Sequence, residues 1–145
     1  MTIDDAIRGL YRAMCFEAGG APDWSLLNDV LAPDARLVRV NDDGVFAFDP
    51  RTFRRDIEAM SLPSFWEGEL SRDVREFTDI AHVLSIYEAR QSRDAAVLFR
   101  AVKSIQLFRS GGRWWISALL WRRAAASSSS ISGDSAGRSR RSLDS

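Results

Sequence analysis

The stretch 100–121 constrains the fold more than any other part of this chain. It reads RAVKSIQLFRSGGRWWISALLW, in which two apolar runs flank the turn Ser110-Gly111-Gly112. Both runs alternate and are rich in β-branched and aromatic residues, which is typical of paired strands, and the glycine-containing turn indicates an antiparallel connection. The sequence therefore predicts a long β-hairpin at this position.

The two faces of this hairpin differ in chemistry. Strict alternation gives one face that is almost pure hydrocarbon: Ala101, Lys103, Ile105, Leu107, Trp114, Ile116, Ala118 and Leu120. The other face mixes aromatic, hydroxyl and amide groups: Val102, Ser104, Gln106, Phe108, Trp115, Ser117, Leu119 and Trp121. Buried polar groups need hydrogen-bond partners, so we expect the mixed face to line a wetted or ligand-filled pocket. We expect Lys103 to lie at a rim or an interface.

The remaining chain supplies helices first and strands later. Apolar periodicity predicts helices over 2–17, 24–31 and 51–60, with Thr2, Asp23 and Asp49 as their N-caps. Alternation and turn residues predict strands over 35–40, 45–48, 65–77 and 80–91. The segment 65–77 is mostly polar, which is typical of an outer strand, and a bulge could interrupt it. This order predicts an α+β fold.

Length and charge bound the possible partners. The 145 residues allow one domain, 1–123, followed by a Ser- and Arg-rich tail, 124–145, that is too polar to form a core. The formal net charge is zero, so apart from the arginines of this tail no feature favours nucleic acid or an anionic membrane. No apolar run approaches the ~20 residues of a membrane span, and the first residues do not resemble a signal peptide. We expect a cytoplasmic protein without nucleic-acid or membrane partners.

Cysteine and histidine are too scarce for several kinds of site. Cys15 and His82 are the only residues of their types, which excludes an intramolecular disulfide and a metal site rich in Cys or His. We therefore expect no metal and no cofactor. Cys15 is interpreted as a small core residue.

Three segments resemble a known superfamily. They are DWSLLNDVLAPDARL at 23–37, IAHVLSIYE at 80–88 and SIQLF followed by RWWI within 104–116. With the order of helices and strands, they resemble the superfamily of nuclear transport factor 2 (NTF2), which includes ketosteroid isomerases, scytalone dehydratase and SnoaL-like polyketide cyclases. The resemblance implies a cone-shaped, cystatin-like fold in which a curved antiparallel sheet wraps on about three N-terminal helices. It also implies a conical pocket for a small, mainly apolar molecule and a homodimer formed through the sheet.

Ketosteroid isomerases offer a test of chemistry. They use a carboxylate base at the end of the first strand, and a tyrosine with a protonated aspartic acid as hydrogen-bond donors. By this resemblance the two carboxylate positions fall on Arg39 and Ser104, and only Tyr11 matches approximately. The departures disfavour steroid isomerisation.

Other residues remain as candidates for the pocket. His82 is a candidate general acid or base because its usual pKa is close to neutral. It shares the mixed face if residue 84 pairs with Ser104, whereas a shift of one residue replaces it by Ser85 and Tyr87. A purely structural histidine is the alternative.

The candidate ligand-binding residues are of two kinds. Tyr11, Ser104 and Gln106 are hydrogen-bond donors, and Trp115 and Trp121 are flat apolar walls. Hydrogen bonding between strands and ordinary core packing are the alternatives for these residues. Two functional hypotheses follow: a cofactor-free isomerase, dehydratase or cyclase that acts on a small apolar molecule, and a non-catalytic binding or dimeric interaction module.

Overall fold

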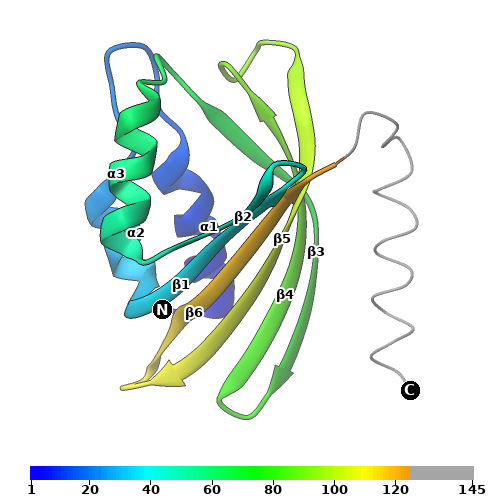
Figure 1. Cartoon of the computed structure of the whole chain (residues 1–145). Coiled ribbons are helices and arrows are strands. Elements are labelled where there is room, and N and C mark those ends of the chain that lie inside the picture. Colours follow the sequence, from blue (N-terminus) through cyan, green and yellow to red (C-terminus); the bar gives the residue numbers. More distant parts are fainter. Residues whose placement is uncertain (125–145) are drawn as a thin grey trace.

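The computed structural model describes residues 1–124, in which three helices cover one face of a curved six-stranded sheet (Figure 1). The helices are α1 (Ile3–Met14), α2 (Trp24–Val30) and α3 (Pro50–Met60). The strands are β1 (Leu31–Asn41), β2 (Gly44–Phe48), β3 (Trp66–Phe77), β4 (Ile80–Arg90), β5 (Val97–Ser110) and β6 (Arg113–Arg123). The predicted α+β class, with a curved sheet on three helices, is confirmed. The expected tail lies outside the described residues except for Ala124.

Each helix begins at the N-cap that the sequence predicts. The Thr2 hydroxyl accepts a hydrogen bond from the amide of Asp5, whose carboxylate accepts one from the amide of Thr2. Asp49 and Thr52 form a similar reciprocal pair before α3, with Pro50 in its first turn. Such caps satisfy amides that have no partner inside the helix. None of the helices in residues 1–124 is long and apolar enough to cross a membrane.

Helix α1 is shorter than predicted because tertiary pairing competes with helix formation. It ends at Met14 rather than at residue 17, and Cys15 is already extended. The backbone of Phe16 exchanges two hydrogen bonds with that of Phe65, at 2.9 and 3.0 Å, which form an isolated bridge. This bridge ties the end of α1 to the segment that leads into β3.

The sheet has the order β2-β1-β6-β5-β4-β3, and among the strands of residues 1–124 only the β1–β6 pair is parallel. The predicted hairpin is β5–β6, which turns through Gly111 and Gly112 at φ values of 61° and 77°. These left-handed conformations favour glycine. Strand β3 is an edge strand with a bulge between Glu69 and Ser71, as the polar sequence of this region indicated.

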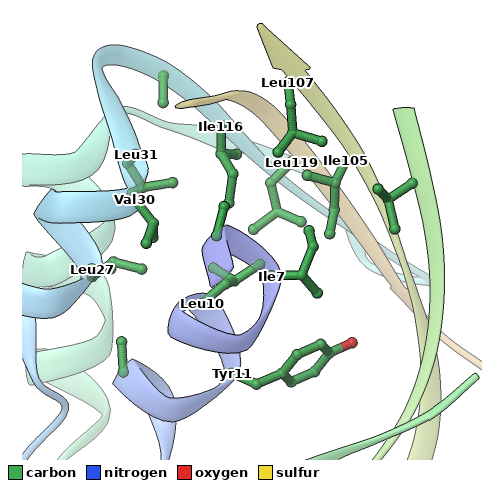
Figure 2. Packing of buried hydrophobic residues seen from close by; sticks show 14 of the residues in the cluster. Ile7, Leu10, Tyr11, Leu27, Val30, Leu31, Ile105, Leu107, Ile116 and Leu119 are labelled. Atoms are coloured by element: carbon green, nitrogen blue, oxygen red, sulfur yellow. The ribbon is translucent and has the colours of Figure 1, made fainter. Parts of the chain in front are cut away.

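The core lies between the helices and the face of the sheet that they cover, which we call the inner face. Figure 2 shows Ile7 and Leu10 of α1 packed towards the strands. The strand residues that they meet are Ile105, Leu107, Ile116 and Leu119. Each fully buried side chain of this size contributes roughly 1.5–3 kcal/mol, so this layer fixes α1 against the sheet.

A bulge in β6 changes which residues share a face. Gln106 pairs with Ala118 but Leu107 pairs with Ile116, so Ser117 is an extra residue in β6. Beyond the bulge the alternation is shifted by one, because an inserted residue reverses the faces of all that follow. The inner face therefore carries Trp114, Ile116, Leu119 and Trp121, a set that strict alternation divides between two faces.

Candidate functional site

The inner face encloses a cavity at the wide end of the cone. Its volume is about 740 Å³, and its lining comes from the end of α1, from α3, from the turn between β1 and β2, and from β3 to β6. A narrower chamber of about 40 Å³ lies deeper and shares Met14, Phe53, Glu67, Tyr87 and Trp121 with the cavity. Lys103 lines only the deeper chamber. The molecule thus has an open cavity with a small floor chamber.

Aromatic side chains form part of the cavity wall, and polar residues line other parts of it. Trp121 packs edge to face on Phe53 with ring centroids 5.7 Å apart, and Phe53 also contacts Phe48 and Trp24. At the mouth, the Arg123 guanidinium lies 3.8 Å from the centre of the Phe99 ring. Such a lining suits a small and mainly apolar molecule.

A buried ion pair forms the floor. The Lys103 Nζ lies 2.7 Å from Glu67 Oε1, and the two side chains are only 5% and 8% exposed. The same ammonium lies 3.8 Å from the centre of the Tyr11 ring and 4.4 Å from that of Tyr87. One carboxylate and two aromatic faces therefore surround the lysine ammonium.

The end of α1 holds Glu67 in place. The Cys15 thiol donates to the backbone oxygen of Tyr11 at 3.3 Å and lies 3.4 Å from both the backbone nitrogen and the backbone oxygen of Glu67. Burial raises the pKa of this thiol, mainly because the charged form would lose water contacts. Cys15 thus acts as a packed structural residue beside the site.

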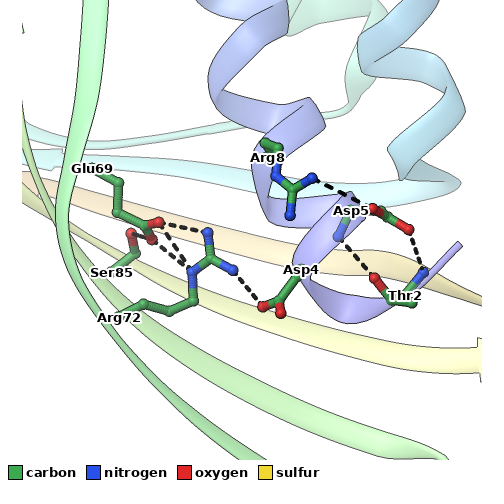
Figure 3. A network of polar contacts seen from close by, with 7 residues as sticks. All are labelled: Thr2, Asp4, Asp5, Arg8, Glu69, Arg72 and Ser85. Atoms are coloured by element: carbon green, nitrogen blue, oxygen red, sulfur yellow. Dashed lines mark hydrogen bonds and ion pairs between the residues drawn. The ribbon is translucent and has the colours of Figure 1, made fainter.

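A second polar network links Tyr11 of the floor to Asp4 in the first turn of α1. The Tyr11 hydroxyl lies 2.6 Å from the Ser85 hydroxyl, which donates to Glu69 Oε2 at 2.5 Å. Arg72 then joins Glu69, at 2.6 Å, to the exposed carboxylate of Asp4, at 2.5 Å. Figure 3 shows the contacts of this network from Ser85 to the start of α1. The hydrogen bonds to Glu69 raise the pKa of Arg72 despite partial burial.

The two tyrosines of the floor remain neutral. Burial is the main cause that raises the pKa of Tyr11 far above its ordinary value, although the hydrogen bond with Ser85 lowers it. Burial also raises the pKa of Tyr87, and the carboxylate of Glu67 adds to this effect. Within residues 1–124 the Tyr87 hydroxyl has no hydrogen-bond partner, and Tyr87 lines both the cavity and the chamber. It can therefore donate a hydrogen bond to a bound molecule.

The structure separates the residues that the sequence predicted to meet. Tyr11 and Trp121 belong to the inner face. Ser104, Gln106, Trp115 and His82 lie on the opposite, outer face of the sheet, away from the cavity. Leu84 does pair with Ser104 and His82 with Gln106, which is the register that puts His82 on the mixed face. The prediction that these four residues line the pocket is nevertheless wrong, whereas Trp121 of the same predicted face does line the cavity.

The residues of the floor escaped the sequence interpretation. Lys103 was expected at a rim or an interface but is 4% exposed inside the cone. In a sequence, a lysine among hydrocarbon neighbours is interpreted as a surface residue unless an acidic partner is recognised. Here the partner, Glu67, belongs to a different strand, β3. The signal that was available is that Lys103 is the only lysine among 20 basic residues.

Arg39, at a position where the resemblance implies a carboxylate, is engaged at the cavity rim. Its guanidinium donates to Asp56 of α3 at 2.9 Å and lies over the rings of Phe46 and Phe48. In residues 1–124 no group of three or more His, Cys, Asp or Glu side chains could hold a metal ion. Glu67, Lys103 and Tyr87 contribute the polar groups of the floor chamber.

Comparison with solved structures identifies the fold. No protein family profile and no curated protein matches this sequence. Solved structures do match, and they include an NTF2-like protein of unknown function from Shewanella baltica, with a TM-score of 0.60 and 12% identity. That match covers 85% of this chain and 94% of the other. The chain has the NTF2-like, cystatin-like fold.

Two further neighbours have names that state an activity. The hexachlorocyclohexane dehydrochlorinase from Novosphingobium barchaimii matches with a TM-score of 0.65 and 13% identity, over 85% of this chain and 84% of its own. The putative ketosteroid isomerase from Parabacteroides distasonis matches with a TM-score of 0.59 and 12% identity, over 86% of each chain. The structures similar to this chain thus include both enzymes and proteins of unknown function.

Proposed function

We propose that this chain binds a small, mainly apolar molecule in its cavity and catalyses a proton transfer on it without a cofactor. The isomerases, dehydratases and cyclases of this fold provide the reaction class. The observation that carries the proposal is the ion pair of Lys103 and Glu67 at the floor of an apolar cavity. In this proposal Glu67 takes the role that the sequence suggested for His82.

The energetics of the pair support a functional role. Removing an ion from water costs several kcal/mol, and a buried pair is often no more stabilising than apolar residues of similar size. The surrounding core is apolar and could accommodate such residues. Charged groups held in a cleft by a specific partner are frequent at catalytic sites.

The roles of the floor residues follow from their chemistry. The Glu67 carboxylate accepts a proton from a carbon of the bound molecule and returns it at the same or a neighbouring carbon. The Lys103 ammonium and the Tyr87 hydroxyl face the negative charge that develops when the proton leaves. The Lys103 and Glu67 side chains are only 5% and 8% exposed, and electrostatic interactions are stronger at such a buried position.

Proton exchange on a simple ketone tests this proposal. 1-Indanone has an apolar body and exchangeable protons next to its carbonyl, and their loss in D₂O is followed by proton NMR. We expect Glu67→Gln to lower the exchange rate that the protein catalyses by about 100-fold or more. Equal exchange with the wild type and with Glu67→Gln would overturn the assignment of Glu67.

The matched control is Glu88→Gln. Glu88 is also a strand glutamate in a short ion pair, 2.7 Å from Arg90, with its side chain 12% exposed. It belongs to the outer face, next to Tyr87 in the chain. We expect this variant to exchange 1-indanone at the wild-type rate, and circular dichroism should confirm that both variants are folded.

The outer face supports a second role, a homodimer. Large apolar side chains are exposed there, with Phe77 at 74%, Ile80 at 57% and Leu120 at 44%. The side chain of Asp73 also lies on the outer face, and one of its buried oxygens has no hydrogen-bond partner within residues 1–124. A second copy packed on this face would cover the apolar groups.

Light scattering of the purified chain tests the dimer. The wild type should have the mass of two chains, and Leu120→Asp should have the mass of one chain. Leu98→Asp is the control, because Leu98 is 56% exposed but lies at the cavity mouth. A monomeric wild type would contradict this second role and would leave the cavity proposal unaffected.

A further inference from the structure

Lys103 has a chemistry that no other side chain of this protein offers. It is the only lysine in 145 residues, and the other basic side chains apart from His82 are arginines. A primary amine can lose its proton and attack a carbonyl carbon, whereas a guanidinium stays charged in proteins. The position therefore holds the one side-chain amine of the chain, and that amine is buried.

The amine has a proton acceptor in direct contact. Transfer of a proton from Nζ to Oε1 along the 2.7 Å hydrogen bond turns the ion pair into a neutral amine and a neutral carboxylic acid. The two side chains are only 5% and 8% exposed, so the transfer takes place between groups that are in direct contact and shielded from solvent. Desolvation of a lysine in an apolar pocket is one of the ways in which a nucleophilic amine is produced.

The amine is also within reach of a bound molecule. Lys103 lines the chamber of about 40 Å³, which shares Phe53, Tyr87 and Trp121 with the wider cavity. A carbonyl group fits such a chamber while an apolar body stays among the aromatic side chains above it. The unpartnered hydroxyl of Tyr87 lies on the same wall and can donate to the carbonyl oxygen.

We propose that Lys103 forms an imine with the carbonyl group of a small apolar aldehyde or ketone bound in the cavity. This inference rests on the proposed function, because it requires the same cavity and the same Glu67. It specifies the substrate class as carbonyl compounds and Lys103 as a covalent catalytic residue.

The reaction is balanced within the site. Glu67 takes one proton from the ammonium, the neutral amine attacks the carbonyl carbon, and a second proton of the nitrogen moves to the carbonyl oxygen. The resulting carbinolamine loses its hydroxyl group with the proton that Glu67 returns, which releases water and leaves a protonated imine beside the Glu67 carboxylate. Electrons drawn towards that nitrogen make the neighbouring C–H more acidic, and Glu67 is placed to remove its proton.

Trapping with a reducing agent tests the imine. The full chain is incubated with 2-naphthaldehyde and sodium cyanoborohydride, which converts an imine into a stable secondary amine, and the product is located by peptide mass spectrometry. We expect one adduct, on Lys103, that forms at least about ten times more slowly in Glu67→Gln because the proton acceptor is lost. Lys103→Arg keeps the charge and should give no adduct at this position.

The outcomes separate this inference from the proposed function. 2-Naphthalenemethanol has the same apolar body but no carbonyl, and its binding is measured by calorimetry. If the alcohol binds and Lys103 remains unmodified by the aldehyde, or only the amino terminus is modified, the imine is wrong and the cavity proposal stands. If the alcohol does not bind and no adduct forms, both fail. Full 1-indanone exchange by Lys103→Arg would also overturn the covalent role.

Discussion

Lys103 Nζ and Glu67 Oε1 lie 2.7 Å apart although the residues are 36 positions apart in the chain. The two strands that carry them, β5 and β3, are not neighbours in the sheet, because β4 lies between them. The side chains therefore reach across the inner face of β4, and Tyr87 of that strand packs its ring against the ammonium. The curvature of the sheet and the end of α1 close this contact off from water.

Replacing one partner of the ion pair should lower the free energy of unfolding more than replacing both partners. We expect Lys103→Met to lower the free energy of unfolding by about 3–5 kcal/mol, because it leaves the buried Glu67 carboxylate without its partner. The double variant Lys103→Met with Glu67→Leu should recover a large part of this loss. Urea unfolding measures both, and a double variant that is less stable than Lys103→Met would contradict this account.

Ser85 of the inner face should contribute more to stability than Ser104 of the outer face. Ser85→Ala removes the hydrogen bonds with Tyr11 and Glu69, and we expect a loss of about 1–3 kcal/mol in urea unfolding. Ser104→Ala on the neighbouring strand faces the other side of the sheet and should change stability by less than about 0.5 kcal/mol. Equal losses for the two variants would be incompatible with the faces assigned to β4 and β5.

Alkaline pH should unfold the protein through its two tyrosines. The pKa values of Tyr11 and Tyr87 are raised above the ordinary 10.0 by burial, so the unfolded state loses these protons first. Stability should be unaffected by them below pH 10.0 and should fall above it, by up to about 1.4 kcal/mol per pH unit for each tyrosine. Tyrosinate absorbance should appear together with the loss of circular dichroism. Tyrosinate in a still folded protein near pH 10.0 would contradict the burial of both rings.

Ligand binding should depend on Trp121 and not on Trp115, although both lie on β6. Trp121→Ala removes a wall of the cavity and should weaken the binding of 2-naphthalenemethanol by about 10-fold or more, since aromatic contacts dominate such sites. Trp115→Ala changes the outer face and should leave the affinity unchanged. Isothermal titration calorimetry measures both. A loss of affinity confined to Trp115→Ala would place the ligand on the outer face of the sheet and would contradict binding in the cavity.

The sequence predicted the elements well and their faces poorly. The hairpin and its glycine turn follow from alternation and turn chemistry, which are local properties, whereas the pairing of Leu84 with Ser104 was one of two registers that the sequence left open. The bulge at Ser117 is not visible in the alternation, and it moves Leu119 and Trp121 to the other face. A single extra residue therefore decides which half of β6 meets the cavity.

The site was harder to predict than the fold because its residues meet only in space. Lys103 is buried because Glu67, Tyr11 and Tyr87, from three other elements, surround its ammonium. Alternation alone shows a lysine among hydrocarbon residues, and a rim position is then the simplest interpretation. The scarcity of lysine was visible from the start, but its meaning depends on the partners that the fold brings to it.

The same scarcity permits a direct measurement of the central claim, that ligands bind against Lys103 at the floor of the cavity. Side-chain ¹⁵N labelling of lysine gives a single NMR signal, from Lys103, and the only histidine, His82, gives a matched signal from the outer face. Titration with 2-naphthalenemethanol should shift the Lys103 signal to saturation and leave that of His82 in place. A saturating titration that shifts the His82 signal, with Lys103 unmoved, would contradict this account.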